Sequence, residues 1–317
     1  MNFLFLILGL ILVLTGAHGL VSGASSIAKR INVPDLVIGL TVVALGTSSP
    51  ELVANYFSVV DGKPDIAIGN ILGSNIANIF LILGITAILS PIRVQSSTIW
   101  KEIPFSLLAA LVLFVVANDQ WIDGAARSEI SRVDGLILLG FMIVFMVYTF
   151  EIARKPGESP AEEIVPMPWW KSIGFVVLGL AGLFWGGKMF VDGASAVARN
   201  WGVSERVIGL TIVAIGTSLP ELATSIMAAL RKQADIAIGN AVGSNIFNVF
   251  FILGSVATIR PLPFNPETSN TDAFVMIAAS VALFLATRLF TINQIGRTEG
   301  VIFAALYATY LGWLLLM

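Results

Sequence analysis

The chain has 317 residues, of which 56% are apolar and only 12% are charged, and its mean hydropathy is +0.90. An ordinary soluble domain carries roughly 25% charged residues, so this composition excludes a soluble globular protein and indicates a membrane protein. The net charge of −2 says nothing about partners, and no basic tract suggests a nucleic-acid partner. The absence of cysteine excludes disulfides, cysteine catalysis and thiolate metal sites.

Apolar segments long enough to cross a bilayer follow one another along the chain. The first lacks the positive flank and the cleavage site of a signal peptide, so we interpret it as a retained helix. The ten predicted spans cover residues 2–22, 36–60, 65–89, 102–118, 133–152, 171–193, 205–229, 235–259, 272–288 and 299–316. The sequence therefore predicts an all-α polytopic membrane protein with ten transmembrane helices.

One linker, residues 153–168, is rich in proline and charge and divides the chain into two units of five spans, 1–152 and 169–317. Trp169 and Trp170 follow the linker, where interfacial aromatic anchors belong. Because five is odd, the second unit must enter the membrane in the opposite sense, which predicts two inverted five-helix repeats.

Lysine and arginine predict the orientation of the chain. The loops after spans 1, 3, 5, 7 and 9 and their flanks hold eleven of these residues, against six on the other side, while Lys188 lies within a span. The positive-inside rule then places the linker in the cytoplasm and both termini on the non-cytoplasmic side. We expect a multi-pass protein of the plasma or inner membrane, in contact with lipid, for which a monomer could be the functional unit.

The two units share one motif. Residues 39–84 and 209–254 align without a gap and are identical at 26 of 46 positions. The identities concentrate in GTSxPEL and DIAIGNxxGSNIxN, whereas residues 53–64 and 223–234 share none. Paired interruptions at equivalent places in two halves of a membrane protein point to the binding site of a transporter.

Glu51 and Glu221 occupy equivalent positions inside apolar spans. A carboxylate at mid-membrane costs about 2.5 kcal/mol or more and is a functional-site hypothesis by default. A structural acid paired with a nearby cation is the alternative, but neither motif contains lysine or arginine.

Pro50 and Pro220 precede these glutamates and predict a broken helix at each GTSxPE motif. Each break frees the carbonyl four residues earlier and places the glutamate at the start of the next half-helix, where the helix dipole favours a negative charge. A kink for packing alone would not explain the adjacent acid and hydroxyls. The hydroxyls beside the two breaks belong to Thr47, Ser48, Thr217 and Ser218.

The second part of the motif adds amide and hydroxyl oxygens. Ser74 and Asn78 are four residues apart, as are Ser244 and Asn248, so each pair shares one helix face. The glycines of GNxxGSN also fit simple helix packing, which is the alternative for these polar residues. We favour Asn78 and Asn248 as ligands, and structural roles for Asn70, Asn75, Asn240 and Asn245. Asp65 and Asp235 fit best as helix N-caps, with a secondary role in attracting cations.

These side chains form a set of oxygens with two carboxylates and neither sulfur nor imidazole. Ca²⁺ prefers six to eight oxygen ligands, and Na⁺ is a hard cation of similar size. Zn²⁺, Cu⁺ and Ni²⁺ prefer nitrogen or sulfur, so the sequence predicts a site for Ca²⁺ or Na⁺.

GTSSPE at 46–51, GTSLPE at 216–221, GNILGSNIANIF at 69–80 and GNAVGSNIFNVF at 239–250 resemble the signature repeats of the sodium/calcium exchangers, in the calcium/cation antiporter superfamily. The chain resembles the compact prokaryotic type. The resemblance implies a secondary antiporter, not an enzyme, without a cofactor, which exchanges three Na⁺ for one Ca²⁺ by alternating access as spans 1 and 6 slide. The ligands that it implies are Thr47, Ser48, Glu51, Ser74, Asn78, Thr217, Ser218, Glu221, Ser244 and Asn248.

Several relatives, including potassium-dependent ones, carry aspartate where this chain has Asn248, so the resemblance implies exchange that is electrogenic and independent of K⁺. The main alternative is a Ca²⁺/H⁺ antiporter of the same fold, although those relatives carry GNxxE in place of GTSxPE.

Two functions of other classes are disfavoured. An intramembrane hydrolase is disfavoured because the chain has one histidine, no HExxH motif and no intramembrane aspartate pair. A passive channel would not require two inverted copies with a closed site between them.

Overall fold

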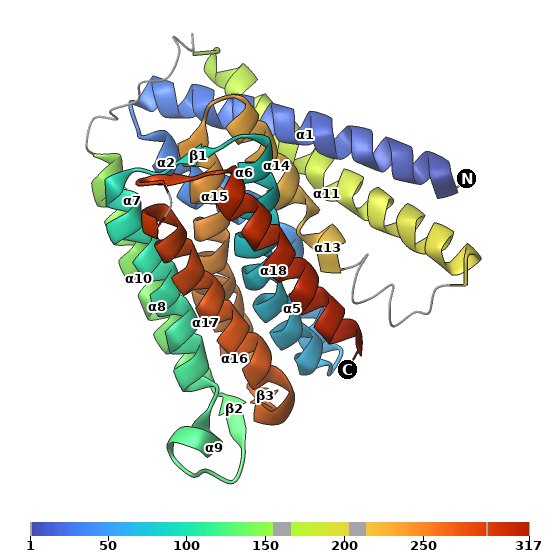
Figure 1. The fold of residues 1–317 in the computed structure, drawn as a ribbon, viewed down its shortest axis with the longest axis vertical. Coiled ribbons are helices and arrows are strands. Elements are labelled where there is room, and N and C mark those ends of the chain that lie inside the picture. The colour runs from blue at the N-terminus through green and yellow to red at the C-terminus, as the bar shows by residue number, and fades with distance from the viewer. Residues whose placement is uncertain (1, 155–165, 203–213, 290, 317) are drawn as a thin grey trace.

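The computed structural model describes residues 2–154, 166–202, 214–289 and 291–316 and is almost entirely helical (Figure 1). Eight of its helices are long and apolar enough to cross a membrane within these ranges, and a bent pair, Asp35–Thr47 with Ser49–Val60, makes a ninth span. The predicted span 205–229 begins in residues outside the described ranges, and its described part contains the apolar helix Leu219–Leu230. The prediction of a polytopic all-α membrane protein is therefore confirmed.

Two spans form the centre of the helix bundle. They are α5–η2–α6 (Pro64–Ala77, Asn78–Leu83, Gly84–Leu89) and α15–η4–α16 (Ala234–Ile246, Phe247–Leu253, Gly254–Ile259). In the second of these spans 94% of the most apolar window is buried, against 22% in α10 (Arg132–Ala153). A helix that is apolar on most of its surface is expected in a protein interior, which agrees with the burial of these two spans.

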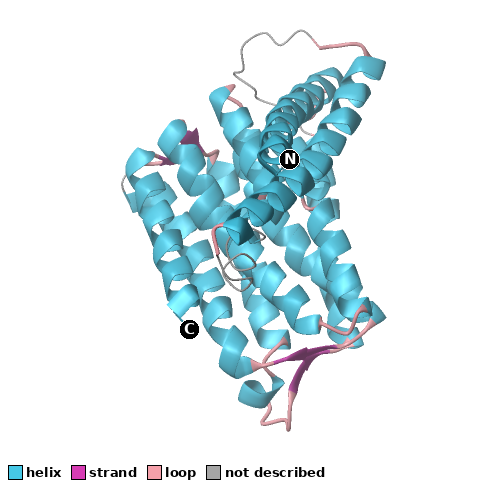
Figure 2. Ribbon diagram, turned by 90° about the vertical axis from the view of Figure 1, so that its right-hand side faces the viewer, coloured by secondary structure: helices cyan, strands magenta, loops and turns pink. Residues whose placement is uncertain are grey.

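The remaining helices surround this centre. Figure 2 shows the long helices from the side and the two strand pairs at the ends of the bundle. The outer helices are α8 (Glu102–Val116), α10, α17 (Pro266–Leu289) and α18 (Arg297–Leu316), with the short α7 (Ser96–Trp100) and α9 (Asp119–Ile122).

Helices α1 (Asn2–Ile31) and α11 (Trp169–Asn200) lie side by side along one flank of the bundle (Figure 1). Glycines let their backbones touch, because a Cβ atom at Gly9 would lie 2.5 Å from the Phe190 nitrogen and one at Gly179 would lie 2.5 Å from the Leu20 nitrogen. Neither helix contributes to the main apolar core, and both pack in a separate smaller cluster. The pair is thus joined more closely to itself than to the bundle.

Two short antiparallel strand pairs lie at opposite ends of the molecule (Figure 1). Strand β1 (Ile92–Arg93) pairs with β4 (Gln294–Ile295), and β2 (Ser128–Ile130) pairs with β3 (Leu262–Phe264). Each half of the chain gives one strand to each pair, with Ile92 opposite Ile295 and Ile130 opposite Leu262. An inverted repeat predicts this exchange of strands between the two ends.

Candidate ion-binding site

Both GTSxPE motifs interrupt a helix, as predicted. Helix α3 (Ala44–Thr47) ends at Ser48, and α4 (Ser49–Val60) continues at an angle of 43° to the preceding segment. In the second copy α13 (Ala214–Thr217) ends at Ser218, and α14 (Leu219–Leu230) follows. The two serines have almost the same backbone angles, φ −83° and ψ 5° for Ser48 and φ −88° and ψ 7° for Ser218. The prolines occupy the first turn of each second half-helix, where a missing N–H is harmless.

Glu51 and Glu221 are each 2% exposed, in the first turn of α4 and α14 respectively. Among the described residues neither is in an ion pair, since the one pair within 4 Å joins Arg127 and Glu129. Each glutamate also has a buried Oε2 atom with no hydrogen-bond partner in the described ranges. Two buried carboxylates that act on each other electrostatically and have no protein cation are arranged to receive one from outside.

Hydrogen bonds across the two halves bring the predicted residues together. The Ser48 hydroxyl lies 3.0 Å from Glu221 Oε1 and 3.0 Å from Ser244 Oγ. Thr47 Oγ1 donates to Asn240 Oδ1 at 3.0 Å, and Asn240 Nδ2 donates to the Glu221 carbonyl at 3.2 Å. Hydrogen bonds therefore connect the helix break in the first half to the helix break in the second half.

Asn78 is held by its amide nitrogen. Its Nδ2 donates to Asn245 Oδ1 at 2.8 Å, and Asn245 Nδ2 donates in turn to the Asn75 carbonyl at 3.3 Å. The buried Oδ1 atoms of Asn78 and Asn248 have no hydrogen-bond partner in the described part of the chain. These two oxygens are suited to a cation, and the contacts of Asn240 and Asn245 are those of positioning residues.

A π-helical stretch adjoins each of these amides. Segment η2 begins at Asn78, and η4 contains Asn248 as its second residue. Such turns are rare and are frequent at functional sites, because the extra residue per turn redirects side chains. The Ser74 hydroxyl donates to Asn70 Oδ1 within α5 at 3.1 Å.

Nine of the ten predicted ligands are buried and Thr217 is partly buried. The set combines two carboxylates with neutral oxygens, and in the described ranges no three His, Cys, Asp or Glu residues gather as a metal site. Asn55 was not among the predicted residues. It lies one helical turn after Glu51, is 1% exposed, and has both side-chain polar atoms without a hydrogen-bond partner among the described residues. It lies in the segment in which the two copies share no residue, so the repeat gave no signal for it.

The predicted N-caps are wrong. Helix α5 begins at Pro64 with Lys63 as its N-cap, and α15 begins at Ala234 with Gln233 as its N-cap. Asp65 and Asp235 are thus the second residues of their helices. In the first copy the reason is Pro64, which is favoured at the first helical position.

Known proteins resemble this chain over nearly its whole length. The sequence profile of the family described as "Sodium/calcium exchanger protein" matches residues 1–151 and 171–316. The chain belongs to the sodium/calcium exchanger family. It is 39% identical to a putative antiporter, CaxA, of Alkalimonas amylolytica, covering 97% of this chain and 96% of that one. It is 32% identical to the sodium/calcium exchanger MaX1 of Methanosarcina acetivorans, covering 98% and 97%.

A solved structure of the sodium-calcium exchanger NCX_Mj, soaked with 10 mM Na⁺ and no Ca²⁺, superposes on this one with a TM-score of 0.82. The two chains are 34% identical, and the match covers 98% of each. Members of this family are membrane ion exchangers and not enzymes, and Na⁺ and Ca²⁺ are their substrates and not cofactors. The resemblance to the compact prokaryotic exchangers is confirmed.

Proposed function

We propose that this exchanger moves Ca²⁺ in one direction and Na⁺ in the other, through the site between the two helix breaks. The pair Glu51 and Glu221 carries the proposal, because both are buried, have an unpartnered oxygen and make no ion pair among the described residues. Two ionised carboxylates match the charge of one Ca²⁺. The hydroxyls of Ser48 and Ser244 and the amide oxygens of Asn78 and Asn248 supply further oxygen ligands.

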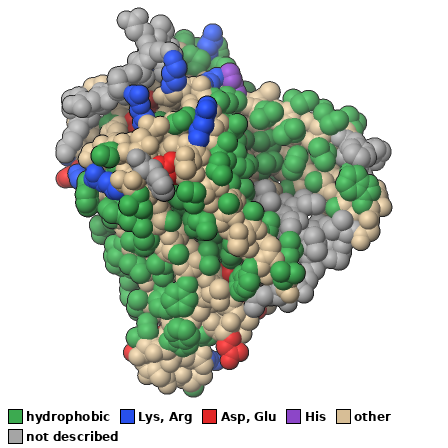
Figure 3. Space-filling model, viewed as in Figure 1, with side chains coloured by type: hydrophobic (Ala, Val, Ile, Leu, Met, Phe, Trp, Pro, Cys, Tyr) green, Lys and Arg blue, Asp and Glu red, His purple; other side chains and the backbone are tan. Residues whose placement is uncertain are grey.

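The proposed stoichiometry is three Na⁺ for one Ca²⁺, with no K⁺ co-transported. An amide at Asn248 leaves the site with two acids, which neutralise Ca²⁺ but leave three Na⁺ with a net charge of +1. The proposed location is the cell membrane, with the lysine- and arginine-rich end in the cytoplasm and both termini on the other side. Figure 3 shows lysine and arginine side chains, in blue, gathered at the upper end of the face in view.

Alternating access requires a part of the molecule that moves past the site. The pair α1 and α11 is suited to this role, because its main contacts are internal and it lies outside the main core. A cavity of about 230 Å³ is lined by Leu180 and Phe184 of α11 together with Thr47 and Pro220 at the breaks. Sliding of α11 would therefore change access to the site from this cavity.

The test is ⁴⁵Ca²⁺ uptake into proteoliposomes that contain the purified protein and are loaded with Na⁺ or K⁺, with and without a pH gradient. We expect uptake that needs outward Na⁺ and falls to background in Glu51→Gln and in Glu221→Gln. Glu267→Gln is the matched control, since Glu267 is exposed in the first turn of α17. Uptake driven by a pH gradient without Na⁺ would assign Ca²⁺/H⁺ antiport instead, and no uptake under either gradient would refute Ca²⁺ transport.

A further inference from the structure

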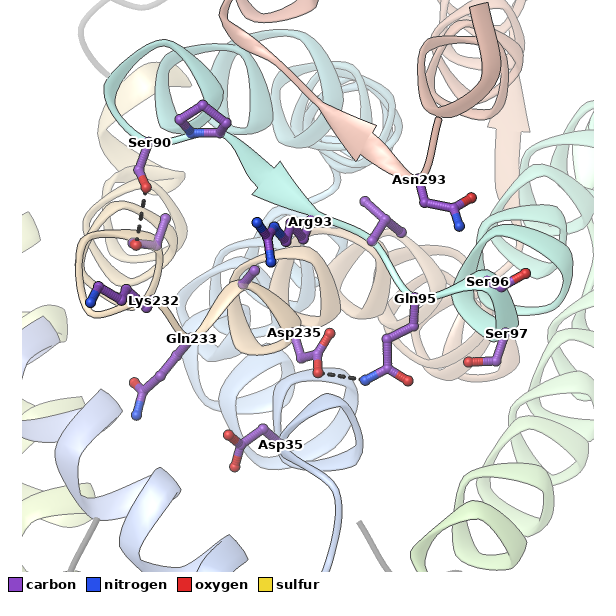
Figure 4. A pocket seen from close by; sticks show the side chains of 14 residues that line it. Asp35, Ser90, Arg93, Gln95, Ser96, Ser97, Lys232, Gln233, Asp235 and Asn293 are labelled. Atoms are coloured by element: carbon purple, nitrogen blue, oxygen red, sulfur yellow. Dashed lines mark hydrogen bonds between the residues drawn. The ribbon is translucent and has the colours of Figure 1, made fainter. Parts of the chain in front are cut away.

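A second group of acidic and amide side chains lines a cavity of about 910 Å³ at the end of the molecule that carries strands β1 and β4 (Figure 4). Its walls come from the start of α2 (Asp35–Ile38), the segment around β1, and the turn that leads into α15. None of these side chains belongs to the site between the helix breaks. The basic loops place this end in the cytoplasm in the proposed orientation.

Two of the lining side chains are buried and incompletely bonded. Asp35 is 5% exposed and Gln233 is 7% exposed, and both line the cavity. Asp35 Oδ1 and Gln233 Oε1 have no hydrogen-bond partner in the part of the chain that the structure describes. An unpartnered buried carboxylate oxygen is costly, and a bound cation would remove that cost.

A second carboxylate faces the same space. Asp235 accepts a hydrogen bond from Gln95 Nε2 at 2.6 Å, drawn in Figure 4, and acts electrostatically on Asp35. Three basic residues lie near this pair: Lys29 acts electrostatically on Asp35, and Arg93 and Lys232 line the cavity. Among the described residues, Lys29 and Arg93 form no ion pair within 4 Å of these carboxylates.

We propose that this cavity holds a second, peripheral site for a hard divalent cation such as Ca²⁺, bound between Asp35 and Asp235. Gln233 Oε1 serves as a neutral oxygen ligand, and water completes the six to eight oxygens that Ca²⁺ prefers. The ligands come from the N-cap and the first turn of α15 and from the start of the first broken span. A cation here therefore ties α2 to α15.

The peripheral site is separate from the central one but near it. On helix α15, Asn240 and Ser244 follow Asp235 by five and nine residues, which is about 7.5 and 13.5 Å at 1.5 Å per residue. Between them the backbones of the first broken span and α15 are in contact, because a Cβ atom at Gly39 would lie 3.0 Å from Ile236 Cα. Cation binding at the peripheral site does not depend on the proposed Na⁺/Ca²⁺ exchange. Only a role of this site in loading or releasing Ca²⁺ at the cytoplasmic side rests on the proposed function.

Mn²⁺ binding measured by electron paramagnetic resonance tests the site on the purified full chain. The background is Glu51→Gln with Glu221→Gln, which disables the central site and keeps the peripheral carboxylates. We expect this double variant to bind one Mn²⁺ that Ca²⁺ displaces. Adding Asp35→Asn or Asp235→Asn should weaken that binding at least tenfold.

The matched control is Asp65→Asn, which removes the same charge from the equivalent position of the first repeat. Asp65 is exposed and does not line the cavity, so its loss should leave Mn²⁺ binding unchanged. The proposal is overturned if the double variant binds no Mn²⁺, or if binding survives both aspartate substitutions. Gln233→Leu gives a third variant if one aspartate variant does not fold. Failure of ⁴⁵Ca²⁺ exchange in the unmodified protein would refute the proposed function and leave this result unaffected.

Discussion

At the scale of single residues, Ser48 connects the two halves of the site. It is the residue at which the first broken span changes direction, and its hydroxyl contacts Glu221 and Ser244 of the other half. Thr47 and Asn240 add a second connection beside it. The carboxylate of Glu221 is thus oriented by a side chain from the opposite repeat, so neither half can form the site alone.

Ser48→Ala should weaken Ca²⁺ binding without unfolding the protein. It removes a hydrogen bond to a charged group, which is worth about 1.5–3 kcal/mol, or roughly 10- to 100-fold in affinity. The concentration of ⁴⁵Ca²⁺ at half-maximal uptake measures the change. Ser58→Ala is the control, since Ser58 donates to the Ala54 carbonyl within its own helix at 2.8 Å. Equal Ca²⁺ dependence in both variants would show that the Ser48 contacts do not position the site.

At the scale of helices, what could be predicted from sequence depended on whether the signal was local. Pro50 and Pro220 predict the two helix breaks, because proline removes a backbone donor wherever it occurs. The π-helical turns at Asn78 and Asn248 were not predicted, since one extra residue in a turn does not change the sequence pattern of a mostly apolar segment. Asn55 was missed because the two copies of the motif share no residue in that segment. That its buried polar atoms lack hydrogen-bond partners among the described residues is seen only in the folded structure.

The same limit applies to the packing of α1 against α11. Glycines are frequent in membrane helices, so the sequence alone does not show which of them touch a neighbour. In the structure Gly179 faces the α1 backbone, whereas a Cβ atom at Gly174 of the same helix would meet nothing within 4 Å. Gly174 and Gly179 are thus distinguished only by the neighbour that each one meets in the folded structure.

Gly179→Ala should therefore destabilise the exchanger and Gly174→Ala should not. A methyl group at Gly179 would lie 2.5 Å from the Leu20 nitrogen and force the two helices apart, and overpacking of this kind costs about 1–3 kcal/mol. At Gly174 alanine gains about 1 kcal/mol of helix propensity and meets no atom. Thermal unfolding in detergent, followed by tryptophan fluorescence, gives the order of the melting temperatures. A melting temperature of Gly179→Ala equal to or above that of Gly174→Ala would show that α1 and α11 do not pack closely at Gly179.

At the scale of the whole molecule, the charge of the loaded site determines which half of the transport cycle senses the membrane potential. With Glu51 and Glu221 ionised, the site with Ca²⁺ is neutral and the site with three Na⁺ carries +1. Moving one charge through 100 mV changes the free energy by about 2.3 kcal/mol. The proposed cycle therefore places the whole voltage dependence in the step that carries Na⁺.

Exchange of ⁴⁵Ca²⁺ for unlabelled Ca²⁺ should then be insensitive to voltage, whereas Na⁺/Ca²⁺ exchange should depend on it. Both are measured in the same proteoliposomes with the potential set by a K⁺ gradient and valinomycin. Asn248→Asp adds a third carboxylate, so an ionised aspartate would leave the site with Ca²⁺ at −1 and the site with three Na⁺ neutral. In that variant the voltage dependence should move to Ca²⁺/Ca²⁺ exchange. Voltage-dependent Ca²⁺/Ca²⁺ exchange in the unmodified protein would mean that the glutamates do not neutralise Ca²⁺ as proposed, and voltage-independent Na⁺/Ca²⁺ exchange would rule out a stoichiometry of three to one.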